Sequence, residues 1–71
     1  MMMDALIVDD EPLSVRRLEI ALRGDARIRD IRTAASVNAA LDHIAKRMPD
    51  LVLLDIEMPG RNGFELVREL S

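Results

Sequence analysis

Two short, wholly apolar runs of this chain each end in aspartate. Residues 6–8 (Leu-Ile-Val) precede Asp9 and Asp10, and residues 51–54 (Leu-Val-Leu-Leu) precede Asp55. Apolar runs of this length, without alternation, are typical of strands buried on both faces of a parallel sheet. Because ligands of open α/β sheets bind beyond the carboxyl ends of the strands, we expect these three carboxylates to meet at one binding edge.

The chemistry of such a cluster indicates a cation. Carboxylates held close together repel one another and raise each other's pKa, which is unfavourable unless a positive charge compensates. An all-oxygen site with open coordination positions suits Mg2+, so the sequence predicts a magnesium site at Asp9, Asp10 and Asp55. Taken singly, these residues have simpler interpretations: Asp9 or Asp10 as a helix cap, and Asp55 as a turn residue at a strand end.

Strands and helices are predicted to alternate along the chain. The first helix begins around Pro12, which is tolerated in a first turn, and runs to about Arg23, with Gly24 as its C-terminal cap. A second strand over residues 30–34 contains charged side chains and is expected at a sheet edge. The core-facing positions expected in the first helix are Val15, Leu18 and Leu22, widened by Leu13, Ile20 and Ala21.

The second helix is predicted from Ser36, a good N-cap, to Met48, because Pro49 then ends it. His43 lies off its apolar stripe and is expected to face solvent. A loop rich in turn-forming residues follows the third strand, and a last helix covers residues 64–70. The apolar stripe of the second helix comprises Val37, Ala40, Leu41, Ile44, Ala45 and Met48.

Residues 6–12 and 49–60, followed by residues 62–66, resemble the receiver domain of two-component response regulators. The resemblance implies a partial receiver domain over residues 1–71, a truncated flavodoxin-like α/β fold of order βαβαβα with a parallel sheet of strand order 2-1-3. It implies a phosphoacceptor at Asp55, a metal-binding acidic pair at Asp9 and Asp10, and a backbone carbonyl ligand at Glu57. The implied cofactor is Mg2+. The implied partner is a sensor histidine kinase or a phosphotransfer protein.

The match covers three of the five βα units of a receiver. The family's hydroxyl residue after the fourth strand, its aromatic on the fifth strand and its lysine after the fifth strand have no counterpart in residues 1–71. Without the lysine, we expect phosphorylation to be inefficient. We also expect the apolar third strand to present an edge that seeks a partner, which predicts a homodimer or a domain-swapped oligomer.

The composition narrows the class of protein further. A chain of 71 residues is one domain at most, and its 49% of apolar residues suffices for a core. The absence of cysteine excludes disulfides and zinc-thiolate sites. No apolar run approaches the ~20 residues of a membrane span, so a cytoplasmic protein without membrane contact is expected.

The charge distribution gives little support to nucleic-acid binding. The net charge is -3, which argues against strong nonspecific affinity for a polyanion. The middle of the chain is locally basic. The simpler interpretation is that its four arginines lie on a solvated edge, in contact with solvent: Arg23, Arg27, Arg29 and Arg32.

Two functions from different classes remain open on the sequence. The first is a phosphoacceptor signalling module, which is not an enzyme in its own right. The second is a non-phosphorylated interaction protein that uses a half-receiver fold to dimerise or to occupy the receiver-binding surface of a partner. Uptake of a phosphoryl group that depends on Mg2+ and on Asp55 distinguishes the two.

Overall fold

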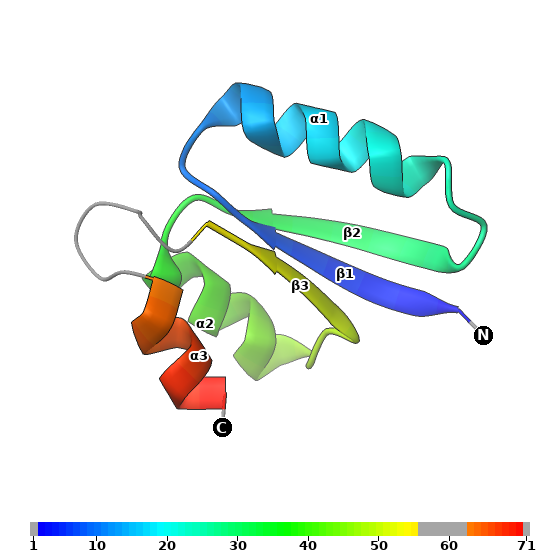
Figure 1. The fold of residues 1–71 in the computed structure, drawn as a ribbon. Helices are drawn as coiled ribbons and strands as arrows, with labels where there is room; N and C mark the ends of the chain where they lie inside the picture. The colour runs from blue at the N-terminus through cyan, green and yellow to red at the C-terminus, as the bar shows by residue number, and fades with distance from the viewer. Residues whose placement is uncertain (1, 56–62, 71) are drawn as a thin grey trace.

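The computed structural model describes residues 2–55 and 63–70 and shows an α/β fold (Figure 1). Three parallel strands form one sheet in the order β2-β1-β3, which confirms the predicted strand order. The elements alternate along the chain as β1 Met3–Val8, α1 Pro12–Arg23, β2 Ile28–Ala34, α2 Val37–Lys46, β3 Leu51–Leu54 and α3 Gly63–Leu70.

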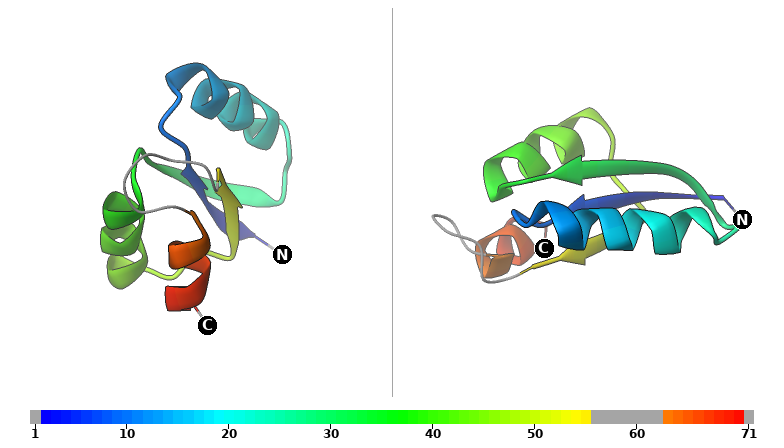
Figure 2. Two further views of the ribbon diagram at one scale, coloured as in Figure 1. Left: turned by 60° about the vertical axis from the view of Figure 1, so that its left-hand side comes forward. Right: turned by 90° about the horizontal axis from the view of Figure 1, so that it is seen from above.

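The helices cover both faces of the sheet. Helix α1 lies on one face, and α2 and α3 lie on the other (Figure 2). The central strand β1 is therefore enclosed, and residues 5–8 have no exposed surface. This is the arrangement that an uninterrupted apolar strand requires, because both sets of its side chains need apolar cover.

The core lies between the sheet and the α2/α3 layer. Leu6 and Val8 of β1 point into it, and one α3 side chain, Leu66, is fully buried there. Burial of a leucine side chain contributes about 1.5–3 kcal/mol, so Leu66 anchors α3 to the rest of the fold. The other members of the buried cluster are Ala34, Val37 and Ala40.

Helix α1 agrees with its predicted bounds, but none of its residues is fully buried, and the expected stripe of Val15, Leu18 and Leu22 is only half-buried. Gly24 is its C-cap, with a backbone conformation in the right-handed helical region. Leu13 and Ile20 are 65% and 61% exposed, and Ala21 is also exposed, so the prediction that these residues widen the stripe is wrong. The reason is that, among the elements the structure describes, α1 packs mainly on β1 and β2, and a single contact surface covers only one narrow side of a helix.

Helix α2 begins where predicted and ends earlier. Ser36 is its N-cap, and its hydroxyl accepts a hydrogen bond from Ala39 N at 3.1 Å. The helix stops at Lys46 because Arg47 is extended, with φ -160° and ψ 124°. Met48 is therefore outside the helix and 63% exposed, and its predicted place in the buried stripe is wrong. His43 is half-buried rather than fully turned to solvent.

No helix in residues 2–55 and 63–70 is long and apolar enough to cross a membrane.

Candidate metal centre

The sheet itself places two of the acidic residues. Asp9 follows β1, and its backbone N–H donates to Ala34 O at 3.0 Å. Asp55 follows β3, and its backbone N–H donates to Val8 O at 2.9 Å. Backbone pairing thus continues one residue past each strand, so that both aspartates emerge at the carboxyl end of the sheet, from the neighbouring strands β1 and β3.

The three carboxylates converge, as the two apolar runs indicated. One side-chain oxygen from each of Asp9, Asp10 and Asp55 lies within 4.8 Å of the others. Asp55 is half-buried and Asp10 is exposed. The cluster is therefore open to ligands from solvent, while sheet hydrogen bonds fix the backbone of Asp9 and Asp55. Glu57, whose carbonyl was expected to complete the site, lies outside the described residues.

The geometry suits a small divalent cation. An octahedral Mg2+ has ligand distances of about 2.1 Å, which puts adjacent oxygens about 3 Å apart and opposite oxygens about 4 Å apart. Three carboxylate oxygens that lie within 4.8 Å of one another are close to this spacing. Carboxylate oxygens are also the donors that Mg2+ prefers.

The charge balance of the cluster points the same way. Within the part of the chain that the structure describes, neither Asp9 nor Asp10 forms an ion pair with a basic side chain. Like charges at this separation are unfavourable without compensation. A cation bound by the cluster could therefore supply the positive charge that these salt bridges do not bring to Asp9 and Asp10.

A short turn holds Asp9 and Asp10 in place. The Asp9 carboxylate accepts a hydrogen bond from Glu11 N at 2.9 Å. Glu11 is the N-cap of α1, and its side chain accepts from Leu13 N at 3.1 Å. Pro12 occupies the first turn of the helix, where no backbone N–H is needed. The turn therefore ends β1 and starts α1 within three residues.

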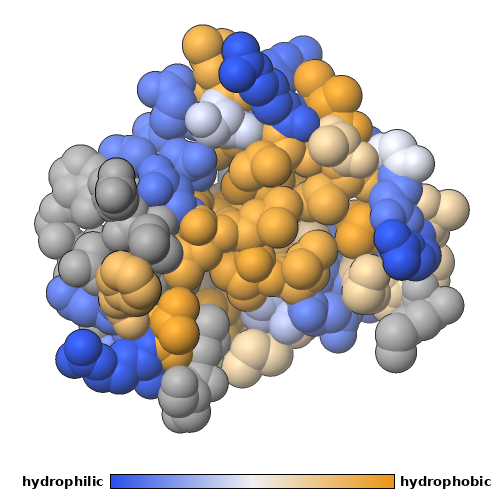
Figure 3. Space-filling view, in the orientation of Figure 1, coloured by the Kyte–Doolittle hydropathy of each residue, from blue (hydrophilic) through white to orange (hydrophobic). Residues whose placement is uncertain are grey.

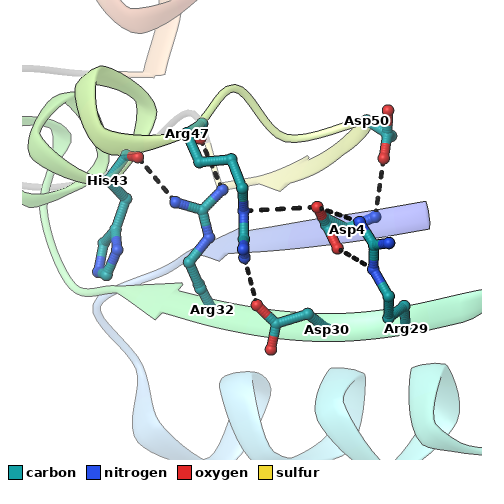
Figure 4. A network of polar contacts seen from close by, with 7 residues as sticks. All are labelled: Asp4, Arg29, Asp30, Arg32, His43, Arg47 and Asp50. Carbon is teal, nitrogen blue, oxygen red and sulfur yellow. Dashed lines mark hydrogen bonds and ion pairs between the residues drawn. The ribbon is translucent and has the colours of Figure 1, made fainter.

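The opposite end of β1 carries an acid in a contrasting environment (Figure 4). Asp4 is buried, with 4% of its surface exposed, and Arg29 donates to both of its carboxylate oxygens at 3.1 and 3.0 Å. Arg47 is also within 3.4 Å of Asp4. The hydrogen bonds from Arg29 lower the pKa of Asp4, and the charges of Arg29 and Arg47 act in the same direction. This acid is compensated by the protein itself and is not a ligand site.

The sequence interpretation missed this network. The four arginines were assigned to a solvated edge, but Arg29 holds Asp4, and Arg32 donates to His43 O and Arg47 O at 2.7 Å each. A β-bulge explains Arg29: Met3 pairs with Ile28 and the next residue pairs with Asp30, so Arg29 is the extra residue. A bulge redirects a side chain in a way that alternation along the strand does not predict.

Comparison with known proteins places the fold and the acidic edge in a family. The model of the response regulator receiver domain matches residues 5–71. The chain belongs to the response regulator receiver domain family. Two solved structures share its fold over 99% of the chain: a mutant of the response regulator MaeR bound to sulfate, with a TM-score of 0.90 and 26% identity, and a response regulator from Cytophaga hutchinsonii, with a TM-score of 0.88 and 29% identity.

Curated relatives of this receiver chain include two named regulatory proteins. It is 41% identical over 70 residues to the transcriptional regulatory protein BtsR of Salmonella typhi and 35% identical over 70 residues to the sensory transduction protein LytT of Bacillus subtilis. The chain spans 29% of the length of each of these relatives and 57% of each of the two solved chains. The receiver chain described here is thus partial in relation to these proteins.

Proposed function

We propose that this receiver takes a phosphoryl group onto Asp55, with Mg2+ held by Asp9, Asp10 and Asp55. The observation that supports the proposal is the convergence of the three carboxylates at the carboxyl end of the sheet. Membership of the receiver family supports the general role, a signalling module of a two-component system. The donor is a phosphohistidine on a histidine kinase or a phosphotransfer protein in the cytoplasm.

The roles of the residues follow from the chemistry of phosphoryl transfer. A carboxylate oxygen of Asp55 attacks phosphorus in line with the leaving imidazole nitrogen; the new O–P bond forms as the N–P bond breaks, and the imidazole takes up a proton. A cation held by these residues would supply positive charge to balance the negative charge that develops on the phosphoryl oxygens. Asp9 and Asp10 hold that charge beside Asp55. The carbonyl of Glu57 is the proposed additional ligand.

The product is an acyl phosphate, which is prone to hydrolysis and suits a transient signal. Among the residues that the structure describes, Lys46 is the one lysine, and it is in the last turn of α2. No lysine of this part of the chain therefore lies at the acidic edge. We therefore expect slow uptake, since electrostatic stabilisation of the transferred group is incomplete.

Incubation with radiolabelled acetyl phosphate, with and without Mg2+, tests the proposal. The expected result is label that requires Mg2+ and is lost in Asp55→Asn. Asp42→Asn is the matched control, because Asp42 is an exposed residue of α2 and the chemical change is the same. Label that survives in Asp55→Asn, or a folded wild type that takes up none with Mg2+ present, would contradict the proposal.

A second candidate function is that of an interaction protein that assembles with a second copy. The contrast between the two edges of the sheet favours it. Strand β2 is protected by the bulge at Arg29 and by Asp30 and Arg32, devices that discourage edge pairing. Strand β3 has none of these: its four residues are aliphatic and half-buried, and within the described residues it pairs only with β1.

The surface around β3 is also apolar. Apolar atoms gather in the middle of the face seen in Figure 3, over β3. On α3, Phe64 and Val67 are 61% and 50% exposed. We propose homodimer formation, through β3 edges or exchanged C-terminal helices, as the way this surface is covered. Light scattering coupled to size exclusion should then give about twice the 8.0 kDa chain mass. A folded monomer at micromolar concentration would exclude this assembly.

A further inference from the structure

The turn between β1 and α1 carries two of the three clustered acids. It has only three residues, Asp9, Asp10 and Glu11, and strand pairing fixes only the first, through the Asp9 N to Ala34 O bond. The directions of the Asp9 and Asp10 carboxylates therefore depend on how the other end of the turn is held. That end is Glu11.

Glu11 is bound through its backbone on both sides and through its side chain. Its N–H donates to Asp9 Oδ1 at 2.9 Å, its carbonyl accepts from Val15 N at 3.1 Å, and its Oε1 accepts from Leu13 N at 3.1 Å. Its backbone is extended, with φ -96° and ψ 111°, as an N-cap requires. The side-chain bond to Leu13 N stabilises this conformation, and this conformation aims the Glu11 N–H at Asp9.

Two consequences for a cation site follow from these contacts. Asp9 Oδ1 already accepts one hydrogen bond, so the second oxygen of Asp9 is the less occupied of the two for a cation. The carboxylate of Glu11 is a fourth acid beside the cluster, but it is held at the positive end of the α1 dipole, where a negative charge is favourable. The cap thus separates Glu11 from the three acids while it orients two of them.

We propose that Glu11 is a positioning residue of the acidic cluster: its bond to Leu13 N fixes the turn that presents Asp9 and Asp10 to a divalent cation. This proposal depends on the metal site of the proposed function and adds a residue that does not itself contact the cation. It predicts that the hydrogen-bond acceptor of the Glu11 side chain matters for cation affinity and that its charge matters little.

Magnesium binding measured by isothermal titration calorimetry separates these effects. Glu11→Ala removes both acceptor and charge, Glu11→Gln removes the charge alone, and Glu11→Ser supplies a shorter capping oxygen. Glu19→Ala is the matched control, because it changes the net charge equally on the same helix, eight residues away. Thermal melting followed by circular dichroism shows the temperature at which each variant is folded for the titration.

The expected result is a Kd for Mg2+ that rises about 3- to 10-fold in Glu11→Ala, in keeping with the loss of an N-cap. Glu11→Gln, Glu11→Ser and Glu19→Ala should stay within about twofold of the wild type. An unchanged Kd in folded Glu11→Ala would overturn the proposal, even if its melting temperature fell, because the role would then be structural only. Equal losses in Glu11→Gln and Glu11→Ala would also overturn it, because charge alone would account for them.

The same titration distinguishes the failure of this proposal from the failure of the metal site. Wild-type protein that binds no Mg2+ would refute the site itself, and the role of Glu11 with it. Wild-type protein that binds Mg2+, together with an unchanged Glu11→Ala, would refute the role of Glu11 alone.

Discussion

Arg32 links the end of helix α2 to strand β2, and its replacement by methionine should destabilise the fold measurably. Its two terminal nitrogens donate to His43 O and Arg47 O at 2.7 Å. His43 O also accepts from Arg47 N at 3.0 Å, whereas Arg47 O lies one residue past the end of α2, where the intrahelical hydrogen bonds have stopped. Arg32→Met keeps much of the apolar part of the side chain and removes both hydrogen bonds. The change in stability therefore reports mainly on these two hydrogen bonds between β2 and the end of α2.

The expected loss is a difference between two opposing effects. Two hydrogen bonds from a charged donor contribute about 3–6 kcal/mol at most, and less here because the bond to Arg47 is exposed. Arg32 Nε is buried without a hydrogen-bond partner among the residues described, and its removal returns about 1–3 kcal/mol. We therefore expect Arg32→Met to lower the free energy of unfolding by about 1–3 kcal/mol, out of about 4–10 kcal/mol for a domain of this size.

Urea unfolding followed by circular dichroism measures this loss. Arg17→Met is the matched control, since Arg17 is an exposed residue of α1 and the substitution is the same. The control should stay within about 0.5 kcal/mol of the wild type. Equal stability of Arg32→Met and Arg17→Met would refute the claim that Arg32 holds the end of α2.

Three further predictions concern the core, acid and metal. Leu66→Ala should lower the free energy of unfolding by about 2–5 kcal/mol in the same urea assay, because Leu66 is fully buried, whereas Val67→Ala, at a half-exposed position, should change it much less. Hydrogen bonds from Arg27 lower the pKa of Asp25 from a usual 3.8 to about 2, and hydrogen bonds from Arg29 lower the pKa of Asp4 from the same usual value. The stabilisation that these two ionised carboxylates give is present above about pH 4 and is lost as the pH falls toward 2. Acid titration followed by circular dichroism should therefore show the stability of the fold decreasing in that range. Mg2+ at 100 times its Kd should raise the free energy of unfolding by about 2.7 kcal/mol in the wild type and by clearly less in Asp9→Asn, and an equal gain in both would contradict the metal site.

The strand order and the acidic edge were predictable from the sequence because they depend on one-dimensional features. An unbroken apolar run indicates a strand covered on both faces, and the residue that follows it lies at the carboxyl end of the sheet. The positions of Asp9 and Asp55 at this edge were therefore predictable from the two apolar runs alone. The bounds of α1 were also predictable, since Pro12 and Gly24 mark its two ends in the sequence.

The remaining features depend on contacts that a linear pattern does not contain. The exposure of Leu13 and Ile20 follows from how few elements pack on α1, which is a property of the whole fold. The Asp4 network depends on a bulge at Arg29 and on an extended Arg47. The end of α2 was misplaced for a related reason: the apolar residue Met48 fits the helical period, but the chain has already left the helix to let Arg47 reach Asp4 and Asp30.

The most direct test of the account is to map where a divalent cation binds on the folded chain. Mn2+ takes the same oxygen ligands as Mg2+, and its unpaired electrons broaden nearby amide signals in a nitrogen-15 NMR spectrum. We predict that trace Mn2+ first broadens the amides of Asp9, Asp10 and Asp55 together, and that excess Mg2+ reverses the effect. Broadening that begins at Asp4 and Asp50, at the opposite end of the sheet, or that shows no preference among the acids, would contradict a shared cation site.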